Sequence, residues 1–329
     1  IKEVPSRKKA IQDAIMSLNT GELLLVAGKG HEKTQDYGGR KLFFSDKEEI
    51  LKAIKLKNKS LSKDLKLNII KEESKSQISN KLKLKNISIN SKIIKKNDVF
   101  FAIKGQKIDG NKFVCEALKK KSSLAIVNKL NQNCLPSKQV KVENTLNFLS
   151  KCSSIFRENI DAKIISITGS CGKTSLKEMI GVILKKISRT TYSLKSFNNK
   201  YGVPLSLFNL KQNDNFGIFE VGMDKTGEID SLTKMIKPDL GIITNISYAH
   251  SKNFENINQI ADAKAEIMNN IKKNGLIVLN KDDYFYDQHK NFAIKKKLKV
   301  ISFGIDNKFS MIKLIKVKRN KNKYELLVD

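Results

Sequence analysis

Residues 164–175 read Ile-Ile-Ser-Ile-Thr-Gly-Ser-Cys-Gly-Lys-Thr-Ser, and this stretch decides the fold class. Its apolar, β-branched start is typical of a buried strand, and residues 176–184 have the apolar spacing of a helix. A strand that leads through a short glycine loop into a helix directs backbone N–H groups at an anion. The strict G-x-x-x-x-G-K-[ST] motif is absent, because Ile167 stands where its first glycine would be. The shorter T-G-S-C-G-K-T pattern still predicts a nucleotide-phosphate site, in preference to a chance surface turn.

The lysine and the threonine of this loop have separate expected roles. Lys173 would reach the β- and γ-phosphates of a nucleotide, and the Thr174 hydroxyl would ligate Mg²⁺. We interpret Cys171 as a small residue that fills space in the loop. The loop residues expected to bind ATP are Gly169, Ser170, Cys171, Gly172, Lys173, Thr174 and Ser175.

Length and composition bound the class of protein. A chain of 329 residues should hold two or three domains, and its hydrophobic content of 40% is enough for ordinary cores. No apolar run approaches the ~18–20 residues that a membrane-spanning helix needs. The sequence starts at Ile1, and residues 1–11 are too charged for a signal peptide. We therefore expect a soluble, cytoplasmic, monomeric protein that has no membrane span and is cut from a longer sequence.

The formal net charge of +30 raises the question of a nucleic-acid partner. Only five of the 63 basic residues are arginine, whereas proteins that read bases favour the bidentate fork of arginine. The aromatic content is 7% and tryptophan is absent, so no stacking platform is evident. Because the lysines are spread along the chain, we expect a general attraction for anionic substrates and no nucleic-acid partner.

The four cysteines, Cys115, Cys134, Cys152 and Cys171, stand far apart and form no C-x-x-C pair. Metal sites and disulfide frameworks usually show regular cysteine spacing. The sequence therefore predicts neither a metal site nor a disulfide framework, which suits a reducing compartment.

Residues 1–54 read as helix, strand, glycine loop and helix. The helices are predicted over residues 7–18 and from Ser45 through residue 54, and the strand over residues 22–27. The loop A-G-K-G-H-E-x-x-Q and the following F-S-D resemble the C-terminal end of the MurE ligases, which add the third amino acid to a UDP-muramoyl peptide. This resemblance implies that Gly28 and Glu32 hold an amino acid.

The resemblance to MurE covers only part of one terminal domain. The segment 55–65, rich in lysine and serine, is predicted to be a linker or domain boundary. The domains expected on this basis are 1–54 (partial MurE-like), 66–158 (UDP-substrate) and 159–329 (ATP-binding).

Residues 66–158 alternate strand and helix, which predicts a small α/β domain with a helix over 113–120 and a strand over 124–127. Its motifs S-I-N-S-K, D-V-F-F-A-I-K-G and D-G-N resemble the N-terminal domain of the MurF ligases, where S-I-D-S-R, G-D-L-F-F-A-x-K-G and D-G-H are usual. The resemblance implies that this domain binds the UDP end of the substrate. The matching positions are Ser91, Lys92 and Lys104, with departures at Asn90, Lys92 and Asn111.

The last 171 residues carry the densest resemblance to MurF, namely seven or so landmarks in order. Among them are S-F-N-N-x-x-G-V-P-L, E-V-G-M, T-N-I-x-x-x-H, A-K-A-E and N-K-D-D. The expected elements are helices at 145–157 and 257–271 and strands at 218–221, 240–244, 276–279, 311–318 and 324–328. The fold class expected is α/β, with the small domain followed by a mostly parallel-sheet P-loop ATPase domain of Mur ligase type. Together with the MurE-like start, this resemblance implies that the chain is a fragment of a MurE–MurF fusion.

Polar residues at the ends of these strands supply the expected site. Thr174 and Glu220 suit Mg²⁺, which prefers oxygen ligands. By resemblance, His250 helps hold a second Mg²⁺, and Lys264 is carbamylated by CO₂ to support that ion. The other residues matched to the family are Asn280 and Asp283 for adenine and ribose, and Asn198 and Asn199 for the UDP substrate. Glu266 lies two residues beyond Lys264 and cannot share its helix face.

The implied reaction is ATP-dependent amide formation. ATP would phosphorylate the terminal carboxylate of UDP-N-acetylmuramoyl-tripeptide, and the amine of D-alanyl-D-alanine would attack the resulting acyl phosphate. Family members also have a C-terminal domain that presents the amine, which we expect to be absent here. Two alternatives remain open at this point. One is a related amide ligase of the folylpolyglutamate synthase type, and the other is a catalytically silent nucleic-acid-binding or scaffold protein.

Overall fold

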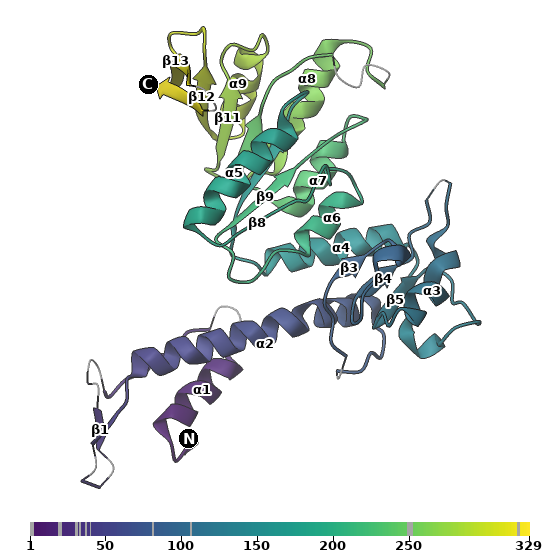
Figure 1. Cartoon of the computed structure of the whole chain (residues 1–329), viewed down its shortest axis with the longest axis vertical. Helices are drawn as coiled ribbons and strands as arrows, with labels where there is room; N and C mark the ends of the chain where they lie inside the picture. Colours follow the sequence, from purple (N-terminus) through teal and green to yellow (C-terminus); the bar gives the residue numbers. More distant parts are fainter. Residues whose placement is uncertain are drawn as a thin grey trace. The chain divides into compact units, whose positions relative to one another are not determined.

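The computed structural model describes residues 3–18, 22–29, 32, 34–36, 38–39, 41–80, 82–105, 107–248, 253–320 and 323–329. The chain divides into two compact units, Ile1–Lys66 and Leu67–Asp329. The second unit contains a small and a large sheet, and helices alternate with the strands of both along the chain (Figure 1). The predicted α/β fold class is therefore confirmed. None of the described helices is long and apolar enough to cross a membrane.

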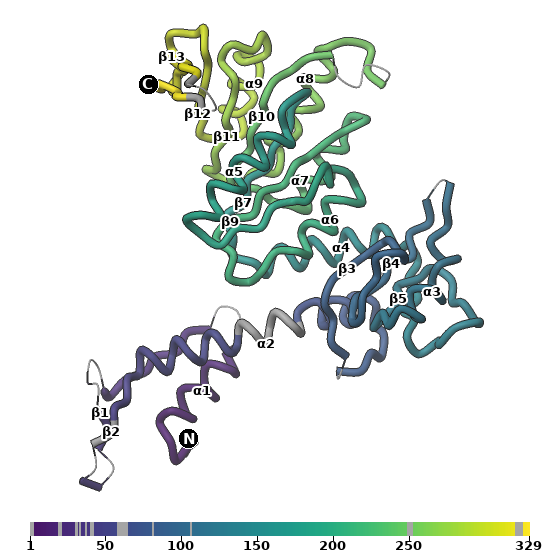
Figure 2. Tube along the Cα trace, viewed as in Figure 1, coloured from purple at the N-terminus to yellow at the C-terminus, as the bar shows by residue number. Residues whose placement is uncertain are grey.

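The first unit is built on two helices and a hairpin. Helix α1 (Arg7–Ser17; Figure 2) ends one residue before the predicted limit at residue 18 and begins after Ser6, whose hydroxyl accepts the Lys9 N–H. Strands β1 (Thr34–Asp36) and β2 (Lys41–Phe43) pair antiparallel. Ile11 and Ile15 of α1 pack against Ala53 of α2 (Asp46–Ser74), which forms the small core of this unit.

Two predictions for the N-terminal region are wrong. Residues 22–27 do not form a strand, because no described segment pairs with them and an isolated strand has no ladder partner. Helix α2 does not end at residue 54 but continues to Ser74. The residues 55–65 contain neither glycine nor proline and are dominated by lysine and leucine, so nothing in them stops the helix. The unit boundary falls at Lys66, within this helix.

A four-stranded parallel sheet opens the second unit. Its order is β3 (Ile87–Ser88), β4 (Val99–Phe101), β5 (Leu124–Val127) and β6 (Gln139–Lys141). Helix α3 (Val114–Lys119) follows a 3₁₀ turn, Gly110–Phe113, and packs on β5. Val114 and Ala117 of this helix share a core with Phe100 and Val127 of the sheet. The predicted strand at 124–127 is confirmed, and the predicted helix at 113–120 is one residue shorter at each end.

An eight-stranded sheet forms the rest of the unit, in the order β14-β13-β12-β11-β10-β7-β9-β8. All neighbours are parallel except the antiparallel pair at the C-terminal edge. The strands are β7 (Lys163–Thr168), β8 (Thr190–Tyr192), β9 (Phe216–Glu220), β10 (Leu240–Ile243), β11 (Leu276–Asn280), β12 (Lys299–Gly304), β13 (Ile312–Asn320) and β14 (Lys323–Val328).

The helices of this part are α4 (Thr145–Glu158), α5 (Lys173–Ile187), α6 (Gly202–Leu207), α7 (Glu228–Ile236), α8 (Ile257–Ala265) and α9 (Tyr286–Lys295). The helix predicted at 257–271 tightens to a 3₁₀ turn, Glu266–Asn270, after α8. Helix α5 packs on β7, β8 and β9, and its half-buried Leu176 and Ile180 contact a core that includes Ile167 (Figure 1).

The site is positioned by the strand order. Strand β7 lies between β10 and β9, so the chain leaves β7 in one direction along the sheet and later returns on its other side. Ligands bind outside the carboxyl ends of parallel strands at such a switch point. The segments that follow β7, β9, β10 and β11 therefore meet at one edge.

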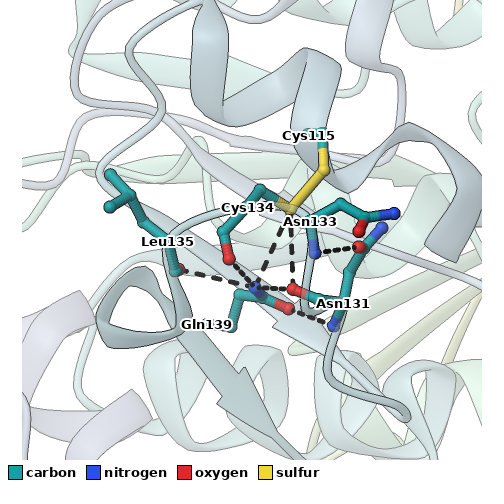
Figure 3. Close-up of a disulfide and its surroundings, with 6 residues drawn as sticks. All are labelled: Cys115, Asn131, Asn133, Cys134, Leu135 and Gln139. Atoms are coloured by element: carbon teal, nitrogen blue, oxygen red, sulfur yellow. Dashed lines mark hydrogen bonds between the residues drawn. A yellow bond between two sulfur atoms is a disulfide. The ribbon is translucent and has the colours of Figure 1, made fainter.

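The small domain contains a disulfide, so the expectation that the cysteines form none is wrong. Cys115 in α3 is bonded to Cys134, with Cα atoms 5.4 Å apart, a normal separation for a disulfide. Gln139 holds the turn that carries Cys134, because its amide donates to the Asn131 carbonyl oxygen and accepts from the Asn131 N–H (Figure 3). Sequence spacing of 19 residues gives no hint of this proximity, which arises from the packing of α3. Cys152 and Cys171 are free.

Candidate active site

The phosphate loop joins β7 to α5 as predicted, although the helix begins earlier, at Lys173. Gly169 and Gly172 have φ angles of 144° and 79°, a region that favours glycine. At Gly169 a Cβ atom would also lie 1.9 Å from the Thr244 hydroxyl oxygen. The loop therefore requires glycine at both positions for its conformation, and at Gly169 for close packing as well.

Lys173 folds back on the loop. Its Nζ atom donates to the carbonyl oxygens of Gly169, at 2.7 Å, and Ser170, at 3.1 Å. Burial lowers the pKa of Lys173, and the nearby Glu220 partly opposes this effect. The ammonium group is thus held against the backbone of the phosphate loop, within reach of an anion bound by this loop.

The segment after β10 forms a wall against the loop. The Ser170 N–H donates to the Asn245 backbone oxygen, at 2.9 Å, and the Cys171 N–H donates to the Asn245 side-chain oxygen, at 3.0 Å. The Ser170 hydroxyl donates to the Ser247 carbonyl oxygen and accepts from the Ser247 N–H. The sequence analysis missed Ser247 in this role, since its contacts use only backbone atoms and leave no motif.

A cluster of oxygen-bearing side chains lies at the other end of the loop. Glu220 is 1% exposed at the end of β9, and its two carboxylate oxygens accept from the Thr174 hydroxyl at 2.7 Å and the Asn198 amide at 2.8 Å. The structure therefore brings Thr174 and Glu220 together as expected. It also places Asn198 beside them, whereas Asn199 accepts from the N–H groups of Tyr201 and Gly202 and holds the start of α6.

This cluster fits Mg²⁺ by the chemistry of its donors. Mg²⁺ prefers oxygen ligands and is usually bound by one or two protein groups together with substrate phosphates. The described part of the chain holds no group of three His, Cys, Asp or Glu side chains that would form an all-protein cage. Thr174 and Glu220 match the first arrangement. His250 lies outside the described residues, so its expected role is a prediction still.

Among the basic groups of the site, Lys264 has the most strongly lowered pKa. It lies on α8 and is 2% exposed. Burial, which is the larger cause, and the positive charge of Lys173 together lower the pKa of Lys264 to about 7. Close to neutral pH, a large fraction of this amine is uncharged and nucleophilic. Glu266 is directed elsewhere, since its carboxylate accepts the N–H groups of Gly227 and Asp230 at the start of α7.

Replacing Lys264 by methionine should stabilise the protein at low pH. A lysine whose pKa falls from 10.5 to about 7 on folding costs stability at every pH below 10.5, and the whole cost is present below pH 7. At about 1.4 kcal/mol per pKa unit, we expect Lys264→Met to gain roughly 2–5 kcal/mol at pH 6. Denaturant melts of both proteins in CO₂-free buffer at pH 6 and pH 10 would measure it. A gain that did not shrink at pH 10 would contradict the assigned cause.

The residues matched to adenine and ribose lie at the end of β11 and just after it, and β11 is the strand next to β10. Asn280 ends β11, and its side-chain oxygen accepts the Asp282 N–H at 3.0 Å. Asp283 follows, and its carboxylate oxygens accept the N–H groups of Ile246 at 2.7 Å and Phe285 at 2.9 Å. Asn280 and Asp283 line a small cavity together with Ile243, Leu279, Tyr286 and His289. Burial lowers the pKa of His289, so this residue is neutral near pH 7.

In the small domain, the motif residues are held by a network that the sequence analysis missed. The buried Ser91 donates to Glu116 at 2.9 Å, and Lys120 donates to the other oxygen of Glu116 at 2.8 Å. The hydrogen bonds from Lys120 and Ser91 hold the pKa of Glu116 below its usual range. Lys92 and Lys104 are exposed and project from the same domain. Glu116 and Lys120 are four residues apart on one helix, and this E-x-x-x-K spacing could have identified them as a pair from the sequence.

In the first unit, Gly28 has a φ angle of 100°, and Arg7 braces the chain beside it by donating to the Ala27 carbonyl oxygen. Arg7 also pairs with Asp46 at the start of α2, and this pairing lowers the pKa of that carboxyl. Glu32 is exposed, and its N–H donates to the Lys29 carbonyl oxygen. The role predicted for Gly28 and Glu32 is not tested by these contacts.

Comparison with known proteins agrees with this geometry. Residues 167–329 match the Mur ligase middle domain. The UDP-N-acetylmuramoyl-tripeptide–D-alanyl-D-alanine ligase of Rickettsia prowazekii is 36% identical over 237 residues, which are 71% of this chain and 52% of the relative. The same ligase of Buchnera aphidicola is 36% identical over 66% of this chain and 49% of its own length. The chain thus spans about half the length of the curated relatives that it matches.

Solved structures give the same result. MurF from Acinetobacter baumannii is 27% identical, with a TM-score of 0.71, over 79% of this chain and 57% of its own. MurF from Thermotoga maritima, solved in complex with ADP, is 25% identical, with a TM-score of 0.65, over 76% and 57%. A parallel sheet, a phosphate loop and these matches together place the chain in the Mur ligase family. Within that family the chain is MurF-like.

Proposed function

We propose that this chain is part of an ATP-dependent ligase that joins D-alanyl-D-alanine to UDP-N-acetylmuramoyl-tripeptide in peptidoglycan precursor synthesis. The observation that carries the proposal is the cluster of Thr174, Glu220 and Asn198 beside Lys173, at the switch point of the large sheet. The similarity to curated ligases of that name supports the choice of substrates. We further propose that the enzyme acts in the cytoplasm as a monomer.

The phosphates of ATP bind where the phosphate loop meets the start of α5. Backbone N–H groups and the helix N-terminus favour negative charge there. Lys173 exchanges the carbonyl oxygens of Gly169 and Ser170 for phosphate oxygens, so its charge faces the phosphoryl group as it is transferred. Thr174 and Glu220 would hold Mg²⁺, which neutralises charge on the β- and γ-phosphates when bound.

Two covalent steps follow. A carboxylate oxygen of the tripeptide attacks the γ-phosphorus of ATP, and the bond from this phosphorus to the β–γ bridging oxygen breaks. The products of this step are ADP and an acyl phosphate. The amine of D-alanyl-D-alanine then attacks the acyl carbon, loses a proton and expels inorganic phosphate, which leaves the amide. Asn198 keeps Glu220 oriented during both steps through its 2.8 Å hydrogen bond.

Lys264 is proposed to carry a carbamate. Its uncharged amine attacks CO₂, and loss of one proton converts the side chain from a base into an anion. The lowered pKa and the neighbouring cation of Lys173 favour this change, because the new negative charge faces a positive one. By resemblance, the carbamate and His250 would support a second Mg²⁺.

The small domain is proposed to bind the UDP end of the substrate through Ser91, Lys92 and Lys104. Replacing Glu116 by glutamine should weaken UDP binding by roughly three- to tenfold, since the Ser91 hydroxyl and Lys120 lose their shared carboxylate. Calorimetric titration of the full chain with UDP would measure this effect. Glu143→Gln, an exposed change elsewhere in the domain, is the matched control. Equal affinity in Glu116→Gln and wild type would contradict the assignment.

The first unit is proposed to derive from the C-terminal domain of a MurE-like ligase, which would make the chain part of a MurE–MurF fusion. What supports this is the loop of Gly28 and Glu32 between two helices that share a core. Reading the gene on both sides of the segment tests it. An upstream reading frame without MurE motifs would contradict the fusion.

Trapping of the acyl phosphate tests the proposed reaction. Hydroxylamine attacks acyl phosphates directly, so it replaces D-alanyl-D-alanine without needing a domain to present it. The chain should form a hydroxamate from UDP-N-acetylmuramoyl-tripeptide only when Mg²⁺ and ATP are both present. A hydroxamate formed instead from a folate γ-glutamate would favour the folylpolyglutamate synthase alternative.

A further inference from the structure

Asp283 connects two parts of the site that are distant in sequence. One of its carboxylate oxygens accepts the Phe285 N–H, at 2.9 Å, within the turn that follows β11. The other accepts the Ile246 N–H, at 2.7 Å, in the segment that follows β10. Hydrogen bonds to a carboxylate are shorter and stronger than those between neutral groups. Asp283 therefore ties the nucleoside end of the site to the β10 segment.

Ile246 is the central residue of the wall that supports the phosphate loop. On one side of it, Asn245 accepts two N–H groups from the loop, those of Ser170 and Cys171. On the other side, Ser247 exchanges two hydrogen bonds with the Ser170 hydroxyl. A shift of Ile246 would move both neighbours, and with them Ser170 and Cys171 of the phosphate loop.

We propose that Asp283 is a positioning residue for the phosphate loop, in addition to any contact that it makes with ribose. The inference rests on the proposed nucleotide site. By holding Ile246, Asp283 fixes Asn245 and Ser247, and these residues fix Ser170 and Cys171. Its removal therefore weakens the binding of phosphates even when the ligand has no nucleoside.

Inorganic tripolyphosphate distinguishes this role from a ribose contact, because it carries the three phosphates of ATP alone. Calorimetry in Mg²⁺ buffer should show that Asp283→Asn binds both tripolyphosphate and ATP about tenfold more weakly than wild type, the effect of one lost charge-assisted hydrogen bond. Asn280→Ala is the matched control, since Asn280 lines the same cavity and its side chain accepts from Asp282 instead of the wall. It should weaken ATP and leave tripolyphosphate within twofold.

The inference fails if Asp283→Asn weakens ATP alone, or neither ligand, while the wild type binds both. If the wild type binds neither ligand, the proposed nucleotide site itself is wrong. Hydrogen exchange in the wild type makes the test independent of how well the variant folds. Saturation with tripolyphosphate should slow amide exchange in residues 244–248 and also in residues 283–286. Protection confined to the phosphate loop, with residues 283–286 unchanged, would likewise overturn the positioning role.

Discussion

Replacing Lys173 by alanine should reduce turnover of an enzyme that contains this chain by about 10²–10³-fold, or roughly 2.7–4 kcal/mol. The ammonium group of Lys173 already lies against the phosphate loop, where it donates hydrogen bonds to two loop carbonyl oxygens and is partly desolvated. It therefore needs little reorganisation to stabilise charge on the transferred phosphoryl group. Steady-state kinetics at saturating ATP would measure the loss, because it should appear in kcat as well as in kcat/KM.

Lys186 offers a matched control for this variant. It is an exposed lysine of the last turn of the same helix, α5, so its replacement by alanine removes one charge far from the loop. We expect Lys186→Ala to keep wild-type turnover. A Lys173→Ala enzyme within about threefold of wild type, or under ~0.7 kcal/mol, would contradict the assignment of the phosphate loop.

The second large effect is expected at Lys264. Lys264→Ala should be nearly inactive, because the site loses the anion that the carbamate provides, and added short carboxylates should restore part of the activity. The unmodified protein should show a carbamate signal by carbon NMR in ¹³C-bicarbonate, and this signal should fade as the pH falls below about 7, where the amine is protonated. A Lys264→Arg enzyme has no amine that can be carbamylated, so a normal rate in this variant would rule the carbamate out.

Local sequence patterns predicted the parts of the fold whose residues are adjacent in the chain. The strand, glycine loop and helix at 164–184 were predictable because β-branched residues, glycines and helical spacing follow one another there. The placement of Glu220 beside Thr174 followed from a rule of topology, since Glu220 ends β9 and Thr174 follows the loop at the carboxyl end of the neighbouring strand β7. The grouping of Asn198 with them needs the path of the loop after β8, which spacing does not define.

Other features depend on contacts that leave no pattern in the sequence. Asp283 acts on a backbone N–H, and any residue except proline supplies one, so its partner Ile246 has no recognisable signature. The Cys115–Cys134 bond depends on the packing of α3 against a distant turn. The strand expected at 22–27 has the right residues, yet strand formation depends on a partner strand that local propensity does not reveal.

Calorimetric titration of the purified chain with Mg²⁺-ATP and with UDP-N-acetylmuramoyl-tripeptide is the most direct test of a MurF-type ligase. The phosphate loop and the small domain lie in one compact unit, Leu67–Asp329, so both ligands should bind, each at one site. Binding of ATP should be weaker in Lys173→Ala than in the wild type, while binding of the UDP substrate should be unchanged. If neither ligand bound, and duplex DNA bound instead with a steep dependence on salt, the ligase assignment would be contradicted and the net charge of +30 would define a nucleic-acid-binding protein.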